Sequence, residues 1–166
     1  MALNGILLWL HVFSAASWFG AVMLFAIVVG PTIGDFSPAT SGEVVVKMLP
    51  KYLRFMVILT VLTPVLGLVT LLVSSNGDLG VFSLDTSYGA YMSVGAILSL
   101  MSWLVVFAVT YPTGRRIVRI TEEFVKNQTP QPPGLPKLAM RLKVSTGIGL
   151  VLLAAILVCM VAAAVS

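Results

Sequence analysis

The chain has 166 residues, of which 58% are hydrophobic and only 10% are charged. A soluble domain carries about 25% charged residues, and polar residues here are too few to cover the apolar surface in water. This composition excludes a water-soluble fold and predicts one integral membrane domain, residues 1–166. The net charge of +4 does not indicate nucleic-acid binding, because all Lys and Arg residues lie between Lys47 and Lys143, where membrane orientation explains them.

Four apolar stretches are long enough to cross the hydrocarbon core, which takes about 20 residues in a helix. They cover approximately residues 3–30, 52–73, 88–111 and 144–165. Pro31 and Pro112 mark the expected ends of the first and third stretches. The sequence therefore predicts an all-α fold, a four-helix transmembrane bundle with up-down-up-down topology.

The connections between these helices differ sharply in basic residues. The first holds Lys47, Lys51 and Arg54, and the third holds Arg115, Arg116, Arg119, Lys126, Lys137, Arg141 and Lys143. The second connection has no Lys or Arg and carries Asp78 and Asp85. Because cytoplasmic loops are enriched in Lys and Arg, we expect a multi-pass protein of the cell membrane. Its first and third connections would be cytoplasmic, and both termini would lie on the non-cytoplasmic side.

The long third connection has two parts. In residues 115–126 the apolar side chains of Ile117, Ile120 and Phe124 recur at helical spacing between basic residues. This pattern is typical of an amphipathic helix, either lying on the membrane or overhanging it, and attracted to anionic lipid. A solvated basic connection is the simpler alternative. Residues 127–136 contain four prolines and predict an extended linker.

The two halves of the chain share a weak pattern. Trp18 and Trp103 each follow a serine and precede a terminal proline, Pro31 and Pro112, at unequal spacings. A duplicated helical hairpin is one explanation of this pattern.

His11 is the only histidine in the chain, and it lies inside the first predicted helix. Ionisable groups within a membrane are costly and usually functional. Three roles are open: a metal or haem ligand, a proton-transfer group, or a hydrogen bond to another helix. Ser14 and Trp18 share the His11 face, which suits a flat apolar ligand lying against the helix. Ordinary packing is the alternative for Trp18.

A family resemblance enters at these residues. The pattern consists of His11-x6-Trp18-x-Gly20, Pro31, Arg54-Phe55 and Thr63-Pro64-Val65-Leu66-Gly67. Over residues 5–70 it resembles a broad group of small four-helix membrane proteins. This group includes copper-resistance-D-type membrane domains and the four-helix protoporphyrinogen oxidase of bacterial haem synthesis. The resemblance implies haem b as the cofactor, with His11 as an axial ligand of the iron.

The chain departs from two members of that group. The oxidase relies on a lysine within its third helix, and residues 88–111 contain none, so protoporphyrinogen oxidation is not expected. A copper site needs several soft ligands close together, whereas the chain has one histidine, one cysteine (Cys159) and no clustered methionine motif.

A single histidine holds haem as a proximal ligand, with the opposite axial position open or filled by methionine. Met92 and Met160 lie at the same expected depth as His11 and are the candidates for a sixth ligand, although core packing is the alternative for each. Two copies of the chain could also share one haem. The predicted cofactor-binding residues are His11, Ser14, Trp18, Met92, Met160 and Arg54.

The propionates of a haem would need interfacial donors or cations. On the non-cytoplasmic side the candidates are Tyr88 and Tyr91, and on the cytoplasmic side they are Lys51 and Arg54.

The sequence therefore predicts a haem-b-binding membrane protein, resembling a b-type cytochrome, with a role in redox chemistry, electron transport or sensing. One alternative is an accessory subunit of a larger membrane complex, with His11 as an interhelical hydrogen bonder. Another is a small transporter. No paired carboxylates, catalytic triad or nucleotide loop is visible, so any catalysis would be a haem-dependent oxidoreduction. The expected partners are the lipid bilayer and a homodimer or larger complex.

Overall fold

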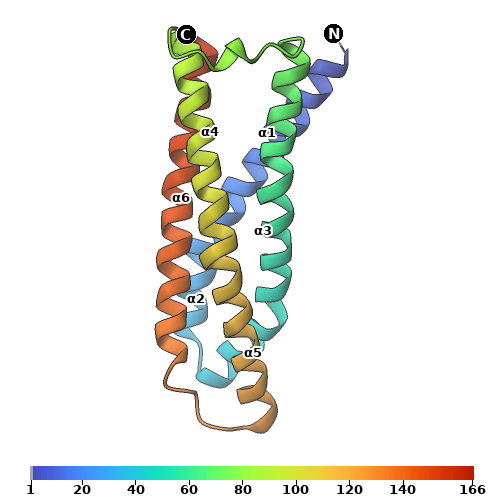
Figure 1. Ribbon diagram of the computed structural model, residues 1–166. Helices are drawn as coiled ribbons and strands as arrows, with labels where there is room; N and C mark the ends of the chain where they lie inside the picture. Colours follow the sequence, from blue (N-terminus) through green and yellow to red (C-terminus); the bar gives the residue numbers. More distant parts are fainter. Residues whose placement is uncertain (1) are drawn as a thin grey trace.

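Four long apolar helices run side by side in the computed structural model (Figure 1), which describes residues 2–166. They are Leu3–Asp35, Pro38–Ser74, Ser87–Asn127 and Leu135–Val165. Each is long and apolar enough to cross a membrane, and no strand occurs within the described residues. The predicted all-α fold with four membrane-spanning helices is confirmed at this level.

Eight helical elements build the four long helices, and a ninth, a 3-10 turn, lies in the connection between the second and the third. In chain order these are α1 (Ala2–Leu24), the π-helical η1 (Phe25–Val29), α2 (Gly30–Asp35), α3 (Pro38–Ser74), the 3-10 turn η2 (Leu79–Phe82), α4 (Ser87–Val105), the π-helical η3 (Val106–Thr110), α5 (Tyr111–Asn127) and α6 (Leu135–Val165). α1, η1 and α2 form the first long helix, and α4, η3 and α5 form the third.

Contrary to the prediction, Pro31 and Pro112 do not end their helices. A proline inside an α-helix lacks the N–H and pushes its ring against the carbonyl four residues back. The chain avoids this clash by widening one turn before each proline into a π-helix. In those turns Gly30 N–H donates to the Phe25 carbonyl and Tyr111 N–H to the Val106 carbonyl. Both halves of the chain use this device, which accords with the suggested duplication.

Two other helices begin earlier than hydropathy predicts. α3 starts at Pro38 rather than near residue 52, with Ser37 Oγ accepting from Thr40 N–H at 3.3 Å. α6 starts at Leu135 rather than near residue 144, so only residues 128–134 remain of the predicted 127–136 linker. The predicted bounds follow uninterrupted apolar content, whereas the added turns mix apolar and charged residues. Pro136 fits the first turn of α6 because a helix leaves that N–H unpaired anyway.

The predicted amphipathic segment 115–126 is the overhanging continuation of the third helix, and its inner face packs on α3. A Cβ on Gly114 would lie 2.7 Å from Leu53 Cδ1, and one on Gly42 would lie 2.8 Å from Val125 Cγ2. Ile117 is buried in this contact, whereas Ile120 and Phe124 are only half-buried. Part of the apolar face that the sequence pattern assigned to lipid therefore packs against α3.

The helices pack mainly in pairs, α1 with α3 and α4 with α6, while α3 and α4 scarcely touch. Both chain termini lie at one end of the bundle, and the α5–α6 connection lies at the other (Figure 1). Two clusters of buried side chains fill the interior. They consist of Trp18, Val22, Met56, Leu59 and Leu153, and of Phe25, Leu49, Leu53, Ile117 and Leu142.

The contact between Gly114 and Leu53 gives a test of the fold. Because Leu53 is buried at 2% exposure, it has no room to retreat from a new methyl group. We expect Gly114→Ala to lower the free energy of unfolding by about 1–3 kcal/mol through overpacking. Gly147→Ala is the matched control, since a Cβ there meets nothing within 4 Å. Thermal unfolding in detergent measures both; equal unfolding temperatures would contradict the α3–α5 packing.

Candidate functional site

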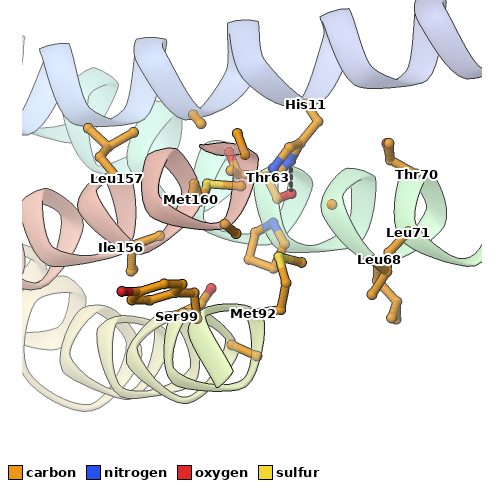
Figure 2. Close-up of a pocket in the computed structure, with 18 of the residues that line it drawn as sticks. His11, Thr63, Leu68, Thr70, Leu71, Met92, Ser99, Ile156, Leu157 and Met160 are labelled. Carbon is orange, nitrogen blue, oxygen red and sulfur yellow. Dashed lines mark hydrogen bonds between the residues drawn. The ribbon is translucent and has the colours of Figure 1, made fainter. Parts of the chain in front are cut away.

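A cavity of about 680 Å³ lies among α1, α3, α4 and α6, in the half of the bundle that holds the termini. Cofactor and small-molecule sites typically enclose roughly 300–1,000 Å³. Figure 2 shows side chains from the four helices around this space. Its walls are mainly apolar and include Leu71, Ile156 and Leu157. Trp18 lies between the cavity and the buried cluster to which it belongs, so it forms part of the cavity floor.

His11 stands on the wall of this cavity and is only 7% exposed. Its Nδ1 lies 3.0 Å from the backbone carbonyl oxygen of Thr63 on α3. A carbonyl oxygen can only accept, so Nδ1 carries the proton and donates. Nε2 is then the unprotonated nitrogen, and no hydrogen-bond partner for it occurs among residues 2–166. The hydrogen bond joins two helices and leaves one lone pair free for a ligand.

The imidazole reaches α3 because Gly67 has no side chain. A Cβ at Gly67 would lie 2.7 Å from His11 Cε1 and 3.3 Å from Nε2, closer than non-bonded carbon atoms approach. The ring therefore lies directly over the glycine. Pro64 lies between the acceptor and the glycine and also lines the cavity. The Thr63-Pro64-x-x-Gly67 stretch of the sequence thus forms the surface on which the histidine rests.

Two methionines from the other pair of helices line the same cavity. Met92 comes from α4 and Met160 from α6, and both are half-buried. Figure 2 shows them around the space that His11 borders. The structure therefore brings together His11, Trp18, Met92 and Met160, which the sequence predicted as one site.

Two buried polar groups on the cavity wall have no partner. Trp18 Nε1 and Thr63 Oγ1 are buried without a hydrogen bond among the described residues, although both side chains line the cavity. Trp18 is 2% exposed and Thr63 is 6% exposed. Burying an unpaired donor costs free energy, and the protein covers both of these atoms almost completely.

The cavity opens at the end of the bundle that holds the chain termini and also on one side. Tyr88 and Tyr91 line it near the start of α4 and are 39% and 41% exposed. Leu68 of α3 and Leu100 of α4 also line it, and both are more than half exposed. Because α3 and α4 scarcely touch, the cavity faces the surrounding lipid between these helices.

Ser14 and Arg54, the other predicted site residues, do not line this cavity. Ser14 is buried on the His11 helix, and its Oγ donates to the His11 carbonyl at 2.8 Å. Arg54 lines a second cavity near the opposite end of the bundle, between α3 and α5. A haem propionate near His11 would therefore meet the tyrosines and not Arg54.

Sequence reasoning did not assign the Thr63 carbonyl as the partner of His11 or Gly67 as its seat. Both positions lie in one short sequence pattern, because a proline directly follows Thr63 and Gly67 is three residues after that proline. Within the described residues no three His, Cys, Asp or Glu side chains form a group that could hold a bare metal ion.

Comparison of the chain with protein-family models, curated proteins and solved structures gives no match.

The tautomer of His11 is directly measurable, because the chain contains a single histidine. We expect 15N-histidine-labelled protein, free of cofactor in detergent, to show one protonated Nδ1 and one unprotonated Nε2. The Thr63 carbonyl stabilises this form by accepting from Nδ1. The 15N chemical shifts distinguish the two tautomers, and a protonated Nε2 with a bare Nδ1 would contradict the hydrogen bond.

Gly67→Ala tests the seat of the imidazole. The new methyl group would overlap the ring, so we expect the His11–Thr63 bond to break and the free energy of unfolding to fall by about 1–3 kcal/mol. Thermal unfolding and the 15N spectrum report the two effects. Gly95→Ala is the control, since it lines the same cavity and its Cβ would meet Cys159 Cβ at an ordinary 3.6 Å. Similar losses of stability in Gly67→Ala and Gly95→Ala would contradict the close contact between His11 and Gly67.

Proposed function

We propose that the chain is a haem-b-binding membrane protein in which His11 is the axial ligand of the iron. The observation that carries this proposal is the placement of His11 on a large apolar cavity, with Nδ1 donating to a backbone carbonyl and Nε2 without a partner. A metal-binding histidine commonly donates its other ring N–H to a carbonyl or carboxylate, which fixes the ring and raises its basicity. The family resemblance of residues 5–70 points to the same ligand.

The remaining cavity residues suit the same group. Met92 or Met160 would supply the sixth ligand, since a thioether is a known partner of histidine on haem iron. The apolar walls would hold the macrocycle and exclude water. Tyr88 and Tyr91, at the mouth of the cavity, would donate to the propionates.

Bound haem supplies one-electron or gas-binding chemistry, while the protein supplies the ligand and the pocket. His11 would fix the position of the iron, and the bond to the Thr63 carbonyl would set the electron density on Nε2. The choice between a redox, electron-transport and sensing role depends on whether a methionine fills the sixth position. His11 is buried within its own bundle, which favours one haem for each chain over a haem shared by two.

The proposal includes an up-down-up-down arrangement in the cell membrane, with both termini outside. Its support is the distribution of Lys and Arg, which occur in the first and third connections and not in the second. The haem would then lie in the outer half of the membrane.

A second candidate function has its own observation. His11 already donates to α3, so it could serve only to join two helices in an accessory subunit of a larger complex. In that case Nε2 would need no ligand, and the protein would co-purify with partner subunits and no pigment.

Absorption spectra of detergent-purified protein from haem-replete cells separate the two functions. We expect a Soret band in the wild type and its loss in both His11→Ala and His11→Asn. The asparagine amide can still donate to the Thr63 carbonyl from nearly the position of Nδ1, but it offers nothing in place of Nε2. His11→Asn should therefore unfold within about 1 kcal/mol of the wild type, whereas His11→Ala should lose about 1–3 kcal/mol.

Met92→Leu and Met160→Leu identify the sixth ligand. The variant that removes it should keep the Soret band but convert the reduced spectrum from six-coordinate to five-coordinate. A colourless wild type would overturn the haem proposal. Pigment retained at full strength in His11→Asn would overturn the role of His11.

A further inference from the structure

The second cavity is a groove near the opposite end of the bundle from His11, where α3 passes α5, and its volume is about 860 Å³. Four arginines line it: Arg54 from α3, and Arg115, Arg116 and Arg119 from α5. All four are exposed. The two helices are held together beside it by the Gly114–Leu53 contact, so the position of these charges is set by the fold.

These arginines have no carboxylate partner. Glu122 is the only acidic residue that lines the groove, and the single ion pair among residues 2–166 joins Lys47 to Glu43 elsewhere. Among these four arginines, only Arg115 makes a side-chain hydrogen bond within residues 2–166: it donates to Tyr111 Oη at 3.3 Å, and its guanidinium carbon lies 5.9 Å from the centre of that ring. Four like charges in one groove raise the local potential and favour an anion.

The groove also has an apolar wall. Val57, Ile58 and Val118 line it next to the arginines, and Ile58 is half exposed. Arg54 and Ile58 are one helical turn apart on the same face of α3. Ile58 lies within an apolar, membrane-spanning stretch, so the groove leads from a cationic end into the hydrocarbon region. A small free anion would fill only the cationic end.

We propose that this groove binds an anionic phospholipid, with the phosphate held by Arg54, Arg115 and Arg119 and an acyl chain along Val57 and Ile58. The guanidinium group forms paired hydrogen bonds with phosphate oxygens, and basic pockets between transmembrane helices bind lipid head groups. The bound lipid links α3 to α5 at a place where the protein has no ion pair of its own. This site is independent of His11 and of any haem.

Lipid titrations of the delipidated full-length protein test the site. In detergent micelles, phosphatidylglycerol should raise the unfolding temperature, and native mass spectrometry should detect one retained lipid for each chain. Phosphatidylcholine at the same concentration should have little effect, because its head group carries no net negative charge. Inorganic phosphate separates a lipid site from a free-phosphate site, and equal stabilisation by phosphate alone would overturn the lipid assignment.

The decisive variant is Arg54→Gln/Arg115→Gln/Arg119→Gln, which should weaken phosphatidylglycerol binding at least about tenfold. Lys126→Gln/Arg141→Gln/Lys143→Gln removes the same number of charges from residues that do not line the groove, and it should bind almost as the wild type does. Equal weakening in both triple variants would mean diffuse electrostatic attraction and would overturn the proposed site.

If circular dichroism shows that the Arg54, Arg115 and Arg119 triple variant is unfolded, the single variants Arg54→Gln and Arg119→Gln replace it. Each should weaken phosphatidylglycerol binding several-fold, and unchanged affinity in both would overturn the proposed site. The Soret band serves as the readout for His11 and should not change in any of these variants.

Discussion

The hydrogen bond from His11 to the Thr63 carbonyl ties the first helix to the second at the wall of the main cavity. It selects the ring tautomer, leaves Nε2 without a partner, and requires a glycine at position 67. A membrane interior offers no water to replace such a partner, so the bond has to be made within the protein. The seat of the imidazole on Gly67 and the cavity wall at His11 depend on this contact.

Proline shapes the rest of the bundle. Pro31 and Pro112 are absorbed by π-helical turns, so the first and third helices continue past them. Pro64 and Pro50 lie inside α3, which runs unbroken from Pro38 to Ser74. Pro64 lies within an apolar stretch, where the surroundings penalise any backbone group that leaves its hydrogen bond. With these prolines inside them, the helices continue beyond the apolar stretches.

Hydropathy was sufficient to predict the number of helices, because each apolar run satisfies the same length requirement. It misplaced the helix ends, since residues 38–51 and 135–143 are helical although charged residues interrupt their apolar content. Trp18 was grouped with His11 by helical spacing, and Met92 and Met160 by depth counted along their helices. Arg54 was predicted as a cation for a haem propionate on the cytoplasmic side, whereas the structure places it in the groove beside α5. The partner of His11 was a backbone carbonyl, and side-chain patterns do not reveal such acceptors.

The third helix contains 41 residues and is therefore about 60 Å long, roughly twice the thickness of the hydrocarbon core. Its upper arm carries Met92 and Trp103 on the cavity wall, and its lower arm carries Arg115 and Arg119 in the groove. The wide turn Val106–Thr110 separates the two arms. A single continuous helix therefore supplies side chains to both the cavity and the groove, and the two sets lie on opposite sides of one wide turn.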